Sequence, residues 1–174
     1  LFGIIVYGSE VAFAVLIIAA SLAGMQEYNQ MAFGAGMSGE KAQTMVIALL
    51  ILLTAVSGDF RLLSAVISFA VMAVLILHLL RIRDREPDMS PVGKTILGLM
   101  YIPVLMSYFI LIRKTPEGVL WIFFILVLAF SGEVAAYYVG KGMGKRKLLP
   151  QVSPGRAVEG AIGLVGGSVA GCVL

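Results

Sequence analysis

The chain has 174 residues, of which 60% are hydrophobic and 13% are charged, with a formal net charge of +3 and a mean hydropathy of +1.00. A soluble domain averages about 25% charged residues, so this chain lacks the polar surface of a water-soluble globule. The composition also excludes disordered and collagen-like classes, and the single Cys172 can form no internal disulfide. We therefore expect a membrane protein with several spanning segments.

Both ends of the sequence lie in apolar runs, because the chain begins at Leu1 without a Met and stops at Leu174. Residues 1–7 are too few to cross a bilayer, which takes about 20 residues. We expect a helix stub at 1–7. We also expect residues 1–174 to form a single transmembrane domain that is a piece of a longer polytopic protein.

Apolar stretches separated by short polar breaks predict an all-α, polytopic fold with about six spanning helices. The first four spans are expected at 11–33, 43–56, 62–80 and 94–112, separated by a loop at 34–42, a tight turn at 57–60 and a charged loop at 81–93. Ser90-Pro91 predicts a helix start, with Ser90 as the cap and Pro91 in the first turn. Pro103 should kink the fourth span near its middle.

The last two spans are expected at 119–140 and from Ala157 onward, with a basic loop at 141–156 between them. The final span carries Gly163, Gly167 and Gly171 at four-residue spacing. Such a face of small residues predicts that another helix approaches closely.

Basic residues are distributed unevenly between the two sides of this topology. Ten of the thirteen Lys and Arg residues lie in segments 34–42, 81–94 and 141–156, whereas turns 57–61 and 113–118 hold the other three. Cytoplasmic loops carry an excess of Lys and Arg, so we expect the three long loops to be cytoplasmic. The positive net charge thus reflects topology, and nucleic acid is not an expected partner.

Residues 131–160 hold most of the side chains that could do chemistry. Glu133 lies in an apolar span, where a carboxylate is costly and should face a polar cavity or a partner, or else pair with a Lys at the interface. The glycine-rich loop that follows carries four basic residues, a combination that suits a polyphosphate: Lys141, Lys145, Arg146 and Lys147. An ordinary basic anchor for anionic lipids is the alternative, and the loop is not a P-loop.

Ser153-Pro154-Gly155-Arg156 predicts a helix N-terminus that could hold an anion. Ser153 would cap a helix beginning at Pro154 and leave backbone N–H groups at the positive end of the dipole. Arg156 could grip a phosphate with two hydrogen bonds. Glu159, one turn further on, could pair with Arg156 or reach a bound cation. A capped helix with an internal ion pair is the alternative that needs no ligand.

Several residues of this region occur in the order of a known family's motifs: Glu133, Ala136-Tyr137, Gly140, Gly144-Lys145, Lys147-Leu148, Pro150, Ser153-Pro154 and Glu159-Gly160. The chain resembles the CDP-diacylglycerol synthase (phosphatidate cytidylyltransferase) family, whose members read D-x-x-AY-x-x-G and then FGK-x-KL-x-P-x-x-SPKKTWEG. Weaker matches are Glu27-Tyr28 with Met31, and Tyr101, Leu105, Ser107 and residues 111–113. The family's Asp, Lys, Thr and Trp are replaced by Glu133, Arg156, Ala157 and Val158.

The resemblance implies that CTP reacts with phosphatidate, with Mg²⁺ assistance, to give CDP-diacylglycerol and pyrophosphate. It implies Glu133 and Glu159 as catalytic carboxylates that orient the basic groups or hold a metal through water. Substrate binding falls to Lys141, Lys145, Arg146, Lys147, Ser153 and Arg156. The family's Asp-rich signature, with the main metal-binding aspartates, would lie beyond Leu174, so we expect these 174 residues to be inactive alone.

The resemblance also implies an integral protein of the bacterial inner membrane, in contact with membrane lipids, with its site facing the cytoplasm. A homodimer is left open. A CTP-dependent polyprenol or phytol kinase is similar around the G…GK…K-x-x-EG pattern, although Ala136-Tyr137 and Ser153-Pro154 favour the synthase. A transporter or a non-catalytic membrane paralogue fits Ala157, Val158 and a chain without the Asp-rich signature.

Overall fold

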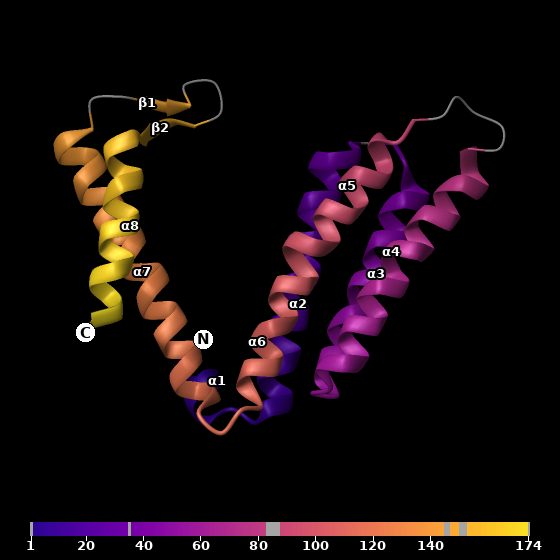
Figure 1. Cartoon of the computed structure of the whole chain (residues 1–174), viewed down its shortest axis with the longest axis horizontal. Coiled ribbons are helices and arrows are strands. Elements are labelled where there is room, and N and C mark those ends of the chain that lie inside the picture. The colour runs from indigo at the N-terminus through magenta and orange to yellow at the C-terminus, as the bar shows by residue number, and fades with distance from the viewer. Residues whose placement is uncertain (1, 35, 83–87, 145–146, 150–152, 174) are drawn as a thin grey trace. The chain divides into compact units, whose positions relative to one another are not determined.

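The computed structural model describes residues 2–34, 36–82, 88–144, 147–149 and 153–173. These residues form helices joined by short turns, apart from one short β-hairpin, which confirms the all-α class (Figure 1). The chain divides into two compact units, Leu1–Gly118 and Val119–Leu174. Each unit is described by itself, and a single transmembrane domain over 1–174 stays a prediction.

The first unit is a bundle of helices. Its last helical span contains a proline near its middle. Its elements are α1 (Phe2–Tyr7), α2 (Glu10–Phe33), α3 (Ser38–Val56), α4 (Phe60–Ile82), α5 (Ser90–Leu99), η1 (Met100–Val104) and α6 (Leu105–Arg113). In a bilayer core no water can pair with backbone groups, so apolar segments adopt helices that satisfy their own hydrogen bonds. The stub expected at 1–7 is therefore helical, as α1.

Helix α3 lies at the centre of the first unit, because it packs against α2, α4, α5, η1 and α6. Its buried residues recur at spacings of three and four, the pattern of one helix face: Thr44, Ile47, Ala48, Ile51, Leu52 and Ala55. The apolar members of this face form one cluster with Met25 and Leu99, which are both almost fully buried. Since lipid tails are as apolar as these side chains, close van der Waals fit holds the cluster together.

The predicted boundary between the loop at 34–42 and the following helix is wrong. Helix α3 begins at Ser38 rather than at residue 43, after Gly34 and Met37 turn the chain with positive φ angles of 58° and 56°. This early start brings Glu40 into the first turn of α3, where a carboxylate is favoured by the helix dipole. Its Oε1 lies 3.3 Å from Nη1 of Arg81 on α4.

The span between 90 and 113 departs from the prediction at its start, and the kink at Pro103 stays a prediction. Met89 is the N-cap and Ser90 is the first helical residue, so the prediction that Ser90 caps the helix is wrong. Asp88 Oδ1 accepts a hydrogen bond from the Ser90 N–H at 2.9 Å. Pro91 lies in the first turn as predicted. Pro103 interrupts the α-helix as a π-helical turn, η1, because proline cannot donate the regular backbone hydrogen bond.

The second unit consists of α7 (Gly118–Met143), β1 (Lys147–Leu149), β2 (Ser153–Ala157) and α8 (Val158–Val173). The two strands pair antiparallel, with Lys147 opposite Ala157 and Leu149 opposite Ser153. Much of the segment predicted as a loop at 141–156 is therefore the end of a helix followed by a hairpin. In Figure 1 the hairpin lies at the end of the unit where α7 stops and α8 starts.

Five helical segments are long and apolar enough to cross a membrane: Glu10–Phe33, Ser38–Val56, Phe60–Arg81, Ser90–Arg113 and Gly118–Met143. The protein is thus an integral membrane protein. The sixth predicted span is α8, whose 16 residues fall short of the roughly 20 that a helix needs to cross a bilayer.

Candidate functional site

A seam of glycines joins α7 to α8. A Cβ atom added at Gly163 would lie 2.8 Å from the Cβ of Val139, and one at Gly167 would lie 2.7 Å from the carbonyl oxygen of Ser131. Real Cβ atoms essentially never approach other atoms this closely. The glycine face predicted on the last helix is therefore confirmed, and its partner is α7.

Two glycines of the family motif, Gly140 and Gly144, also lie where the end of α7 meets the residues that follow it. Gly140 lies inside α7, and its added Cβ would be 3.6 Å from the Cα of Gly160 on α8. A Cβ at Gly144 would be 2.8 Å from the Cβ of Ala157. Gly140 is thus in ordinary van der Waals contact with α8, whereas at 144 a Cβ has no room beside Ala157 at the end of β2.

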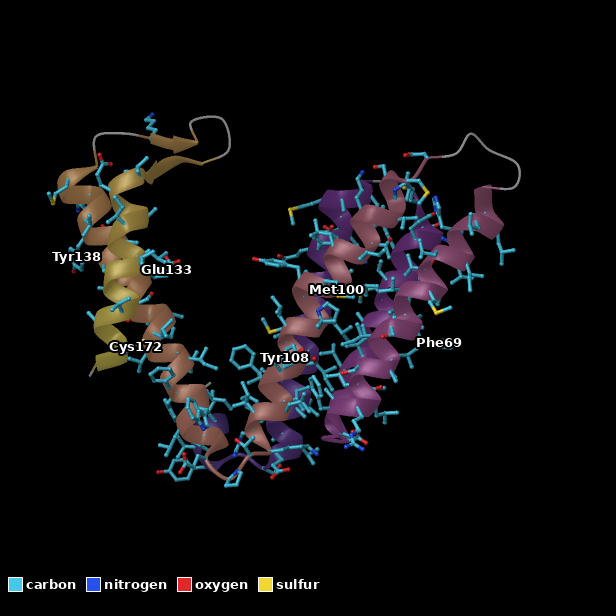
Figure 2. All side chains as sticks on the ribbon, viewed as in Figure 1. Phe69, Met100, Tyr108, Glu133, Tyr138 and Cys172 are labelled. Carbon is cyan, nitrogen blue, oxygen red and sulfur yellow. The ribbon has the colours of Figure 1, made fainter. Side chains whose placement is uncertain are left out.

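The opposite face of α7 carries a carboxylate, an aromatic ring and an ammonium group. Glu133, Tyr137 and Lys141 are spaced by four residues, so they lie on one helix face, and all three are exposed within their unit. The Nζ of Lys141 lies 5.6 Å from the centre of the Tyr137 ring. Tyr138 packs edge-on against Tyr137, with ring centroids 5.5 Å apart. Figure 2 shows Glu133 and Tyr138 projecting from α7.

The hairpin corrects the prediction for Ser153. Ser153 and Arg156 lie in β2, and α8 begins only at Val158, so Ser153 does not cap a helix starting at Pro154. The strand register shifts between Lys147 and Leu149, which sets residues 154–156 opposite the single residue 148. Proline and glycine are tolerated in such a bulge because an unpaired residue needs no ladder hydrogen bond.

The structure brings most of the predicted site residues to one end of the second unit. Lys141 is in the last turn of α7, Lys147 is exposed on β1, and Glu159 is in the first turn of α8. Arg156 precedes α8 by two residues, on β2. Glu133 lies eight residues before Lys141, about 12 Å along the helix axis. Lys145 and Arg146 lie outside the described residues.

Among the described residues, no three His, Cys, Asp or Glu side chains gather as a metal site would require. Glu133 and Glu159, the two carboxylates of the 131–160 region, come from different helices. Mg²⁺ that arrives with a nucleotide needs only one or two protein carboxylates, because phosphate oxygens and water complete its shell. The described residues therefore offer single carboxylates for such an ion, and they do not form a site in which protein side chains alone surround the metal.

Sequence reasoning missed a polar network in the first unit. Thr44 Oγ1 donates to Asn29 Oδ1 at 2.9 Å, and both side chains are buried. Asn29 Nδ2 donates to the Lys41 carbonyl at 3.4 Å. The signal for this network was present, since Asn29 follows Glu27-Tyr28 in an apolar helix, where a polar side chain needs a partner.

One of the two weaker family matches, at 27–31, contacts α5 in the first unit. The hydroxyl of Tyr28 on α2 donates to the carbonyl of Lys94 on α5 at 2.8 Å. A Cβ at Gly98 would be 2.8 Å from Cδ1 of Tyr28, so the ring packs directly on the α5 backbone. The motif at 27–31 thus helps to join α2 to α5.

The model of the cytidylyltransferase family matches residues 1–174. The chain belongs to the cytidylyltransferase family. This membership agrees with the expected resemblance. The match covers both units.

Curated relatives of this cytidylyltransferase family member carry a more specific name. The phosphatidate cytidylyltransferase of Bacillus subtilis is 44% identical over 73 residues, which cover 41% of this chain and 27% of that protein. The one of Pseudomonas aeruginosa is 36% identical over 67 residues, 38% of this chain and 25% of that protein. The one of Synechocystis is 27% identical over 201 residues, 94% of this chain and 67% of that protein. No solved structure matches the chain.

Proposed function

We propose that the complete gene product containing this chain is a phosphatidate cytidylyltransferase. The observation that carries the proposal is the family match over residues 1–174, together with relatives of that name. In the proposed reaction a phosphate oxygen of phosphatidate attacks the α-phosphorus of CTP. A new oxygen–phosphorus bond forms, the bond to the β-phosphate bridge breaks, and pyrophosphate leaves with that electron pair. The product is CDP-diacylglycerol.

The end of the second unit supports this chemistry. The reaction joins two anions, so positioning and charge neutralisation matter more than covalent catalysis. Lys141 and Lys147 are exposed at the ends of α7 and β1. We assign the phosphates of both substrates to them and to Lys145, Arg146 and Arg156, with Ser153 as a hydroxyl partner from β2. A site at a helix end near the bilayer surface suits a soluble nucleotide and a membrane-held lipid phosphate.

Magnesium is proposed as the cofactor, on the family resemblance. When bound, it would neutralise charge on the CTP phosphates. Glu159 stands in the first turn of α8, beside the strand that carries Arg156. It is the carboxylate that we assign to hold the ion through water or to orient the basic groups. The site is proposed to face the cytoplasm of the bacterial inner membrane, where CTP is available. A homodimer stays a prediction.

The test uses the purified complete gene product in mixed micelles with phosphatidate, Mg²⁺ and CTP labelled either at the α- or at the γ-phosphate. A cytidylyltransferase moves the α-label into lipid and releases the γ-label as pyrophosphate. We expect α-label in a CDP-lipid product and none from γ-labelled CTP.

The same two labels separate the alternatives. With a polyprenol in place of phosphatidate, a CTP-dependent kinase would place the γ-label, not the α-label, in lipid. That result, with no CDP-lipid from phosphatidate, would refute the proposal. Absence of lipid label in both arms, from protein that is folded, would favour a transporter or a non-catalytic paralogue.

A further inference from the structure

The face of α7 formed by Glu133, Tyr137 and Lys141 is here called the α7 polar face, and all three side chains are exposed among the described residues of their unit. The α8 glycines contact a different face of α7, through residues such as Ser131, Ala135 and Val139. Tyr137 is 60% exposed within the structure described. The seam with α8 therefore uses a different side of the helix and leaves the α7 polar face uncovered by α8.

The position of Glu133 shows that lipid is a poor neighbour for the α7 polar face. Helix α7 is long and apolar enough to cross a membrane, and Glu133 lies about 12 Å from Lys141 towards its interior. A carboxylate facing hydrocarbon at that depth is costly and is normally matched by a polar partner. The partner must supply hydrogen-bond donors to Glu133 and tolerate contact with an aromatic ring.

A cytosine base meets both requirements. Every nucleobase presents a flat π-face that stacks on an aromatic ring, and cytosine carries an N4 amino group that donates to carboxylates. Lys141 lies beyond Tyr137 on the same face and can meet negative charge on the phosphate side. Its ammonium group already stands over the Tyr137 ring, 5.6 Å from the centre. Attraction to a triphosphate would draw it off the ring and free that ring for stacking.

We propose that the α7 polar face reads the base of CTP: Tyr137 stacks on cytosine, Glu133 accepts a hydrogen bond from its N4 amino group, and Lys141 contacts its phosphates. The inference rests on the proposed function. It assigns Glu133 to the nucleobase, leaving Glu159 as the carboxylate for an ion. Discrimination against UTP follows, because uracil has an O4 acceptor where cytosine has the N4 donor, and two acceptors repel each other.

The experiment measures CDP-lipid or UDP-lipid formation by the complete gene product with CTP and UTP. Isothermal titration of each nucleotide runs in parallel. Tyr137→Leu should raise KM for CTP roughly tenfold, with KM for phosphatidate unchanged, while Tyr137→Phe keeps the ring and most of the affinity. Glu133→Gln should lower the CTP-to-UTP ratio of kcat/KM at least about tenfold, because an amide can also donate to O4. Phe130→Leu removes a similarly exposed ring about two turns away on α7 and should change neither quantity.

The outcomes separate this inference from the proposed function. If the unaltered protein makes CDP-lipid and Tyr137→Leu leaves KM for CTP unchanged, the ring is only an interfacial anchor and the inference is wrong. A Glu133→Gln variant that loses activity equally with CTP and UTP would assign Glu133 a structural role instead. If no CDP-lipid forms at all, the proposed reaction fails, while weaker CTP binding by Tyr137→Leu in the titration would still support the base-stacking role.

Discussion

At the scale of single residues, the buried pair Asn29–Thr44 gives the first unit a polar contact between α2 and α3. The hydroxyl of Thr44 donates to Asn29 Oδ1 at 2.9 Å and also lies 2.8 Å from the carbonyl of Lys41. Asn29 and Thr44 are 2% and 0% exposed. Because no water replaces a lost partner at such a site, each group depends on the other. The pair therefore fixes the register of α2 against α3.

We predict that Thr44→Val destabilises the protein by about 1 kcal/mol, because it leaves Asn29 Oδ1 without its donor. The free energy of unfolding in mixed detergent micelles measures this. Thr54→Val is the matched control on the same helix, since the Thr54 hydroxyl donates to the Leu50 carbonyl of its own helix in an exposed position. It should change stability by less than about 0.5 kcal/mol. Equal effects of the two substitutions would show that the Asn29 contact is not special.

The candidate site was partly predictable at this scale. Residue type and order pointed to Glu133, the basic residues of 141–156 and Glu159, because charged groups beside an apolar span are few and stand out. The sequence did not predict that Tyr137 lies under Lys141, on a face opposite the α8 seam. That fact depends on which side of α7 the glycines of α8 cover, and only packing decides it.

At the scale of elements, glycine spacing turned out to be the most reliable tertiary signal in the sequence. Gly163, Gly167 and Gly171 predicted a close helix contact, and α7 provides it. The hydroxyl of Ser168 adds a hydrogen bond across the seam to the Leu128 carbonyl at 3.2 Å. Small residues allow such backbone approach because they remove the side chains that would keep two helices apart.

Neighbouring glycines on α8 give a direct test of this seam. A Cβ at Gly167 would be 2.7 Å from the Ser131 carbonyl oxygen, whereas nothing lies within 4 Å of a Cβ at Gly166. We predict that Gly167→Ala destabilises by about 1–3 kcal/mol through overpacking. Gly166→Ala should be neutral or slightly stabilising, since alanine favours helix over glycine. Thermal unfolding of the two variants measures the difference, and equal melting temperatures would contradict the seam.

The hairpin was not predicted, because residues 153–156 were expected to begin a helix and instead lie in β2. A Ser-Pro pair is typical of a helix start, but Pro154 is also tolerated where a short strand bulges. Pairing of β2 with β1 places Ser153 opposite Leu149, so its backbone serves the strand instead of a helix cap. Local residue preferences were compatible with both arrangements. The partner strand decided between them.

At the scale of the whole molecule, the alternation of helices and the placement of charge give one consistent topology. The ends that join α2 to α3, α4 to α5 and α7 to β1 carry the basic segments. The turns after α3 and α6 carry few basic residues. An excess of Lys and Arg marks the cytoplasmic side, so the end of the second unit that carries Lys141 and Lys147 is expected in the cytoplasm.

This orientation can be tested with single cysteines in a Cys172→Ser background in intact cells. We predict that a membrane-impermeant maleimide labels Ser57→Cys and Glu117→Cys, whereas it labels Gly36→Cys and Gly142→Cys only after permeabilisation. All four positions are exposed, so access to the reagent, not burial, decides the result. The reverse pattern would place the candidate site outside the cytoplasm and would remove the supply of CTP that the proposed function needs.

The sequence by itself determined the membrane class, the approximate positions of the helices, the charge asymmetry and the family resemblance. These depend on composition and on short-range order, and a bilayer leaves apolar segments little choice but the helix. The tertiary structure alone decided the hairpin between α7 and α8, the buried Asn29–Thr44 pair and the face of α7 that carries Glu133, Tyr137 and Lys141. Each of these depends on contacts between separate elements, where the partner, rather than local preference, selects the conformation.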